Sequence, residues 1–233
     1  MNNSLNSILK CLKNYNGKTY FSETGEDAVL SQVFKESNGR YLDIGAQHPI
    51  FGSNTFFFYK KGWSGIAIEP QDRFNFLWRI FRRRDKLLNL LVGNSMEPME
   101  FAEFENSLLS SADQGTILKH INRGEKPYYK TFKPATLSSI LAKQIDPNEP
   151  FFISIDVEGM EFDVISTINF PQQQPRAILI ENWCAPWVKK SAASVFLESS
   201  GLYELFAHTG LTSVYVNKNY MSKINNLRSY LSE

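Results

Sequence analysis

Residues 40–49 read RYLDIGAQHP, and this stretch decides the fold. A short apolar strand ends at Asp43, and Gly45 follows where the chain must turn tightly. Residues 64–70, SGIAIEP, repeat the pattern and place Glu69 at the end of the next predicted strand. In open α/β sheets, ligands bind outside the carboxyl ends of the strands, so both carboxylates are predicted to border one binding site.

Short apolar runs alternate with amphipathic segments along the rest of the chain, a pattern typical of βαβ units around a parallel sheet. The predicted strands cover residues 40–44, 64–68, 86–92, 151–155, 177–180, 202–207 and 213–216. The predicted helices cover residues 26–36, 53–60, 73–81, 137–143, 160–167, 189–199 and 220–231. Only residues 208–211 join the last two strands, which predicts an antiparallel hairpin. We therefore expect an α/β, Rossmann-like fold with a seven-stranded, mostly parallel sheet, a C-terminal antiparallel hairpin and helices on both faces.

The length and composition favour one domain. The chain has 233 residues, of which 42% are hydrophobic and 21% charged, enough to fill the core of one sizeable α/β domain. We expect this domain to span 1–233, with an N-terminal helical segment at 1–38. Residues 94–134 break the alternation without clear periodicity, and we interpret them as an irregular lid or acceptor-binding insertion.

Charge and cysteine usage exclude several classes of protein. The formal net charge is +1, so nothing draws the whole chain to nucleic acid. Cys11 and Cys184 stand far apart, which fits a reducing compartment rather than a disulfide framework. The N-terminus lacks an apolar core typical of a signal peptide, and no run approaches the roughly 20 apolar residues of a transmembrane segment. We expect a cytoplasmic protein.

The two strand ends favour an adenosyl cofactor without phosphates. Glu69 can accept both ribose hydroxyls, and Asp43 can accept hydrogen bonds from an ammonium group. Gly45 would let the backbone approach the ligand, while Ser53 and Asn54 could present polar groups to an amino-acid end. A G-x-G-x-x-G fingerprint, which cradles pyrophosphate, is missing. This pattern favours S-adenosylmethionine, and an NAD-dependent oxidoreductase remains an alternative.

Carboxylates also follow two later strands. FFISIDVEGME, residues 151–161, delivers Asp156 and Glu158 to the same edge, and ILIEN, residues 178–182, delivers Glu181 and Asn182. Carboxylates this close can act as a general base or bind a divalent ion. The oxygens of Asp156, Glu181 and Asn182 would suit Mg²⁺, although the same groups could instead hydrogen-bond the substrate directly.

Other side chains allow two interpretations. His48 could take a proton from an acceptor hydroxyl, or could hydrogen-bond the backbone. Trp183 and Trp187 could receive a sugar ring. The run 82–84, three arginines, is predicted to be a solvated helix end, with a phosphate-bearing acceptor such as a nucleotide sugar or lipid-linked glycan as the alternative. The aromatic run 56–59 is predicted to lie in the core.

Because several motifs occur in the order and at the spacing of one family, the chain resembles the FkbM-type methyltransferase family from about residue 21 to residue 182. The segments that carry the resemblance are FSETGED (21–27), DIGAQHP (43–49), SNT (53–55), GWSGIAIEP (62–70) and IDVEGME (155–161). The chain differs at Gln47, where the family pattern would have Asn, and residues 108–113 match the family's serine-rich stretch only loosely.

This resemblance implies a class I methyltransferase fold, S-adenosylmethionine as donor and O-methylation of a sugar or natural-product hydroxyl. It places Asp43, Gly45 and Glu69 at the cofactor, and Asp156 and Glu158 beside the transferred methyl group. The pattern of Asp156 with residues 181–182 also resembles the metal site of catechol-type O-methyltransferases.

We therefore expect an S-adenosylmethionine-dependent O-methyltransferase that acts on a hydroxyl of a sugar, glycan or related metabolite, in polysaccharide biosynthesis or a similar process. Asp156, Glu158 or His48 would supply the base, with or without a divalent metal. The alternative from another class is a non-catalytic scaffold of the same fold in a glycan-assembly complex.

Overall fold

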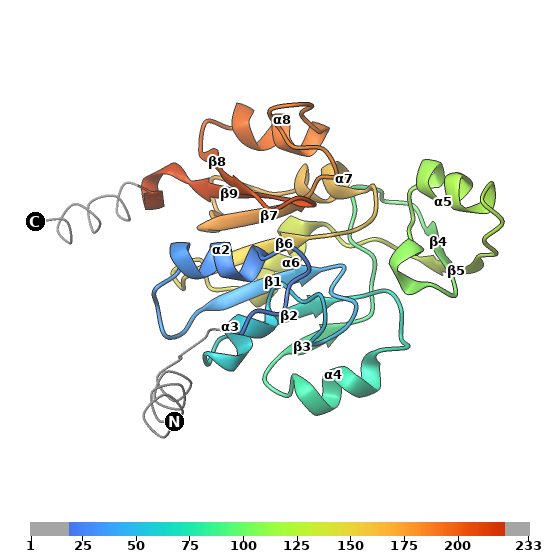
Figure 1. Ribbon diagram of the computed structural model, residues 1–233, viewed down its shortest axis with the longest axis horizontal. Helices are drawn as coiled ribbons and strands as arrows, with labels where there is room; N and C mark the ends of the chain where they lie inside the picture. The colour runs from blue at the N-terminus through green and yellow to red at the C-terminus, as the bar shows by residue number, and fades with distance from the viewer. Residues whose placement is uncertain (1–18, 222–233) are drawn as a thin grey trace, which may run out of the picture.

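The computed structural model describes residues 19–221 and has a seven-stranded sheet at its centre (Figure 1). The strand order is β3-β2-β1-β6-β7-β9-β8. The first five strands in this order are parallel, β9 pairs antiparallel with β7, and β8 pairs antiparallel with β9. The strands of this sheet are β1 (Arg40–Ile44), β2 (Ser64–Ile68), β3 (Lys86–Leu88), β6 (Phe151–Ile155), β7 (Ala177–Glu181), β8 (Tyr203–His208) and β9 (Thr212–Asn217). This is the predicted class I methyltransferase layout.

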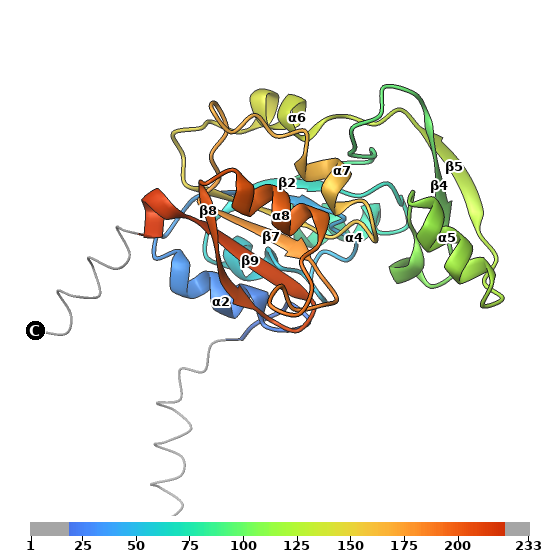
Figure 2. The same ribbon diagram turned by 90° about the horizontal axis from the view of Figure 1, so that it is seen from above.

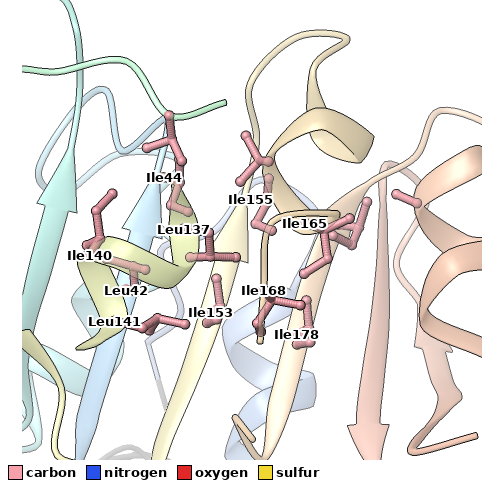
Figure 3. Close-up of a cluster of buried hydrophobic side chains, with 14 of the residues drawn as sticks. Leu42, Ile44, Leu137, Ile140, Leu141, Ile153, Ile155, Ile165, Ile168 and Ile178 are labelled. Carbon is pink, nitrogen blue, oxygen red and sulfur yellow. The ribbon is translucent and has the colours of Figure 1, made fainter. Parts of the chain in front are cut away.

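Helices cover both faces of the sheet, because alternate residues of each strand point to opposite faces. On one face, α6 (Leu137–Gln144), α7 (Glu161–Ile165) and α8 (Ala192–Ser199) pack on aliphatic side chains of the parallel strands, as Figure 3 shows for α6 and α7. On the other face, α2 (Glu26–Val33), α3 (Phe56–Lys60) and α4 (Asn75–Phe81) pack on a second, more aromatic core. Figure 2 shows α2 and α6 on opposite sides of the sheet. The aromatic run 56–59 contributes Phe57 and Phe58 to this core, as predicted.

Several elements are shorter than predicted. The strand expected at 86–92 ends at Leu88, because Asn89 turns away and donates hydrogen bonds to the backbone carbonyls of Glu69 and Gln71. Helix α8 begins at Ala192 rather than at 189, because the Ser191 hydroxyl caps it by accepting from the Ser194 amide. Residues 222–231 of the helix expected at 220–231, and residues 1–18 of the N-terminal segment 1–38, lie outside the described residues.

The insertion is not irregular, which corrects the interpretation of residues 94–134. It forms an antiparallel pair, β4 (Met99–Glu103) and β5 (Tyr128–Phe132), a short 3-10 turn η1 (Ser107–Leu109) and helix α5 (Gln114–Ile121). Figures 1 and 2 both place this unit to one side of the large sheet. The period-two pattern was hidden in the sequence because most residues of β5 are solvent-exposed on both faces.

Within residues 19–221, no helix is long and apolar enough to cross a lipid bilayer.

Candidate active site

The carboxyl ends of four parallel strands border one cavity of about 1010 Å³. Asp43 is the next-to-last residue of β1, and Glu181 is the last residue of β7. Glu69 directly follows β2, and Asp156 directly follows β6. All four residues line this cavity. The sequence predicted this convergence, because parallel strands present their carboxyl ends at the same edge of a sheet.

Gly45 brings the ends of β1 and β6 into contact. Its φ angle is 79°, and a Cβ atom built there would lie 1.6 Å from the carbonyl oxygen of Asp156. The Gly45 amide donates to the Ile68 carbonyl at 2.9 Å, which ties this turn to β2 as well. Gly45 lines the cavity, yet the glycine is required by the packing of strand ends rather than by the approach of a ligand.

Two backbone amides hold the Glu69 carboxylate. Its Oε2 accepts from the Gln47 amide at 2.9 Å, and its Oε1 accepts from the Gln71 amide at 2.9 Å. Gln47 adopts a φ angle of 40°, a left-handed conformation in which Asn is better tolerated than Gln. Burial raises the pKa of Glu69, and the two amides partly offset that rise. Each oxygen retains a lone pair for a ligand hydroxyl.

The Asp43 carboxylate is held through a relay of hydrogen bonds. The Thr55 hydroxyl donates to Asp43 Oδ2 at 2.6 Å, and Arg82 Nη2 donates to the Thr55 hydroxyl oxygen at 2.8 Å. Burial raises the pKa of Asp43, whereas the Thr55 hydrogen bond and the Arg82 charge lower it. The carboxylate at the end of β1 is therefore fixed in position before any ligand arrives.

The predicted solvated end of the arginine run is wrong for Arg82. Its side chain is fully buried and pairs with Asp85 at 2.6 Å, and its other nitrogens donate to the Pro49 carbonyl and to the Tyr41 hydroxyl. Arg82 does not line the cavity. A run of arginines at a helix end looks solvated because the buried partners Tyr41, Pro49 and Thr55 come from distant parts of the chain. Arg83 is exposed, as predicted.

Ser53 and Asn54 both line the cavity. The Ser53 hydroxyl oxygen accepts from the amides of Thr55 and Phe56 at 3.3 and 3.2 Å, so it caps α3. The Asn54 side chain donates to the Ser154 hydroxyl oxygen at 3.0 Å, which leaves its amide oxygen for a ligand. Asn54 is thus better placed than Ser53 to meet a cofactor.

Three carboxylates gather at the ends of β6 and β7, where they line the cavity. Asp156, Glu158 and Glu181 each offer one oxygen, and these oxygens lie within 4.8 Å of one another. Asp156 is open to the cavity, but the protein atoms around it limit solvation, and this desolvation with the charges of Glu158 and Glu161 raises its pKa. Desolvation and the charge of Asp156 raise the pKa of Glu181 to about 10. At neutral pH and without a cation, this pair therefore retains a proton.

Asn182, the third predicted metal ligand, directly follows Glu181 at the end of β7. Its side chain lines the cavity, but its amide nitrogen donates to the hydroxyls of Ser213 and Ser194 at 3.4 and 3.5 Å. The backbone amide of Asn182 also donates to the Leu211 carbonyl at 2.6 Å. The structure thus brings Glu158 beside the predicted pair of Asp156 and Glu181, while Asn182 lines the same cavity.

Glu158 combines backbone strain with a titration near neutrality. Its φ angle is 51°, a left-handed conformation that a non-glycine residue adopts at a cost, and its carbonyl accepts from the Ser111 hydroxyl at 2.8 Å. Desolvation and the nearby charge of Glu161 raise the pKa of Glu158 to about 7. Glu161 itself accepts from the Gly159 amide at 3.0 Å and begins α7.

His48 lines the cavity, but its ring is engaged with the backbone. Its Nδ1 accepts from the amides of Ile50 and Phe51 at 3.1 and 3.0 Å, so the neutral ring carries its proton on Nε2. Desolvation lowers the pKa of His48. In this tautomer the free nitrogen is a donor, which favours the backbone interpretation over the role of general base.

The sequence missed several residues of the cavity wall. Glu26 accepts from the Thr24 amide at 3.0 Å and from the Thr209 hydroxyl at 2.9 Å; burial raises its pKa, but these hydrogen bonds outweigh burial and leave it lowered. Its segment, 21–27, carried the family resemblance, and that was the available signal. The insertion adds another part of the wall, including Phe101, Leu108, Leu109, Ser110, Lys119 and Arg123.

The two tryptophans behave differently. Trp183 is 71% exposed and lines the cavity, where its ring is free to meet a ligand. Trp187 is equally exposed, but its ring packs edge-on against His208 with centroids 5.6 Å apart and does not line the cavity. Only Trp183 therefore has the position expected of an acceptor contact.

The family described as Methyltransferase FkbM domain matches residues 43–231. No curated protein matches the chain. The chain is similar to the solved structure of a precorrin-6y C5,15-methyltransferase from Geobacter metallireducens (13% identity, 82% of this chain and 86% of that chain, TM-score 0.45). It is also similar to the solved structure of an O-methyltransferase from Bacillus cereus in complex with SAH (12% identity, 93% of this chain and 91% of that chain, TM-score 0.43). Likenesses at this level carry no conclusion about the activity of this chain.

Proposed function

This chain belongs to the FkbM methyltransferase family, and from that premise we propose that it transfers a methyl group from S-adenosylmethionine to a sugar-type hydroxyl. The observation that carries the proposal is the convergence of Asp43, Glu69 and Glu158 on one cavity. Its volume of about 1010 Å³ reaches the upper end of the usual range for ligand sites, which leaves room for a donor and an acceptor together.

The donor half of the cavity fits the chemistry of S-adenosylmethionine. Glu69 offers two oriented acceptors for the ribose hydroxyls, while Asp43 and the Asn54 amide oxygen suit an ammonium group. A carboxylate-rich wall would repel a pyrophosphate, so the same residues disfavour NAD. Bound here, the donor would supply an electrophilic methyl group on a sulfonium.

The transfer is an in-line displacement in which the acceptor oxygen bonds to the methyl carbon as the carbon–sulfur bond breaks. The protein must orient the two ligands and remove the hydroxyl proton. We assign the proton to Glu158, because a carboxylate with a pKa of about 7 is a competent base at neutral pH. Asp156 holds a proton with Glu181 and is less available, and His48 presents a donor.

A divalent cation is a further part of this proposal. Asp156, Glu181 and Asn182 would hold it beside Glu158, because hard cations such as Mg²⁺ prefer carboxylate and amide oxygens, and all three residues line the cavity. The cation would supply Lewis-acid activation of the acceptor hydroxyl. Metal-free protein prepared with a chelator should then lose activity and regain it with Mg²⁺, and full activity after chelation would remove the cation from the mechanism.

A sugar acceptor is favoured by the aromatic face of Trp183 at the cavity wall, because sugar rings stack on flat aromatic side chains. The test is transfer of a labelled methyl group from the donor to purified glycans, nucleotide sugars and lipid-linked sugars. We expect a labelled O-methyl product with the unaltered protein. We expect none with Asp156→Asn, which should still bind the donor. Label on nitrogen or carbon would contradict the assignment to oxygen.

A further inference from the structure

Basic side chains from two segments line the cavity. Lys119 lies in the last turn of α5, Arg123 in the turn that follows, and Lys189 and Lys190 in the segment before α8. Lys190 is paired with Glu198, but none of the ion pairs within residues 19–221 engages Lys119, Arg123 or Lys189. Three cations thus border the cavity without a carboxylate partner of their own.

Helix α5 and the turn that follows it carry Lys119 and Arg123 on one face. Thr116, Lys119, His120 and Arg123 follow the spacing that aligns side chains along one side of a helix, and all four line the cavity. The positive charge of Lys119 also acts on Glu158, whose pKa it lowers. Lys119 therefore lies near the carboxylate to which we assign the acceptor proton.

A basic residue in the last turn of a helix can simply complement the helix dipole. Lys143 has that role in α6 and does not line the cavity. Lys119 and Arg123 differ from Lys143 because they face an open volume that the acceptor must occupy. Ammonium and guanidinium groups in such a position are the usual partners of phosphate oxygens.

We propose that Lys119 and Arg123 form an anion subsite, and that the acceptor is a sugar carrying a phosphate or pyrophosphate group. The proposal rests on the methyltransferase function above and names its substrate class. A phosphate held here would fix the sugar ring with one hydroxyl toward Glu158. The carrier beyond the phosphate is a nucleoside or a lipid, and both share this chemistry.

Calorimetric titration of the full chain with inorganic pyrophosphate tests the subsite directly. We expect saturable binding, and Lys119→Met and Arg123→Met should each weaken it by about tenfold, the effect of losing one charge-assisted contact. Lys143→Met is the matched control and should bind pyrophosphate as the unaltered protein does. The subsite is refuted if pyrophosphate does not bind, or if Lys119→Met and Arg123→Met bind it no more weakly than Lys143→Met.

Two further arms identify the carrier and separate the two proposals. Uridine diphosphate and geranyl diphosphate carry the same pyrophosphate, so tighter binding of either than of pyrophosphate supports the subsite and identifies a nucleoside or a lipid carrier. Each titration is repeated with S-adenosylhomocysteine alone. Variants that lose pyrophosphate but keep S-adenosylhomocysteine are folded and support the subsite. If the unaltered protein does not bind S-adenosylhomocysteine, the proposed donor site is contradicted, while the result for pyrophosphate still tests the anion subsite.

Discussion

Glu158 sets the expected pH dependence of the reaction. Desolvation and the charge of Glu161 raise its pKa to about 7, so the carboxylate that accepts the proton forms only as the pH rises through neutrality. For a pKa near 7, about a tenth of the Glu158 side chains are ionised at pH 6 and about nine tenths at pH 8. We therefore expect kcat/KM to rise about tenfold across this interval.

Glu158→Gln removes the base while keeping the size of the side chain. We expect kcat to fall by about 10² to 10⁴, the usual contribution of a general base, and the rise between pH 6 and 8 to disappear. Labelled methyl transfer at saturating donor measures both quantities. His48→Gln is the matched control, because His48 also lines the cavity, and it should retain the rise.

A flat profile in the unaltered protein between pH 6 and 8 would refute this assignment. So would a Glu158→Gln variant that keeps the rise while His48→Gln loses it, because the proton would then pass to the imidazole.

Three other predictions concern the framework of the site. Arg82→Met should lower the free energy of unfolding by about 3–5 kcal/mol because it leaves a buried carboxylate unpaired, whereas exposed Arg83→Met should change it little; urea denaturation compares the two. Gly45→Ala should destabilise by about 3 kcal/mol or more, through a clash with backbone and a left-handed φ angle, and a melting temperature equal to that of the parent would contradict the packing. The pKa of Glu181 is raised from 4.5 to about 10 in the folded protein, so the free-energy cost of ionising it is absent below pH 4.5 and grows as the pH rises toward 10. Glu181→Gln removes this cost and should therefore raise the free energy of unfolding more at pH 8 than at pH 5. An equal effect on the free energy of unfolding at both pH values would oppose this.

The strand ends were predictable from the sequence because their signal is local. Asp43, Glu69, Asp156 and Glu181 each end an apolar run, and the topology of parallel sheets places such ends together without further information. The hairpin of β8 and β9 followed from the short connection between two apolar runs.

The remaining features depend on contacts between distant segments. Arg82 is buried because Tyr41 and Thr55 meet it from distant segments, and a run of arginines gives no sign of them. The basic face of α5 was missed because the surrounding insertion shows no clear periodicity. The αL conformation of Glu158 arises where β6 meets the insertion through Ser111, and no local pattern marks it.

Calorimetric titration with S-adenosylmethionine, side by side with NAD, tests most directly whether the edge of the sheet is a donor site. We predict saturable binding of S-adenosylmethionine, no displacement of bound S-adenosylmethionine by NAD, and an affinity for S-adenosylmethionine lowered about tenfold or more in Glu69→Gln, which loses a charged acceptor for the ribose. Failure of the unaltered protein to bind S-adenosylmethionine, or equal affinity in Glu69→Gln, would contradict the account and favour a scaffold that keeps the fold without the reaction.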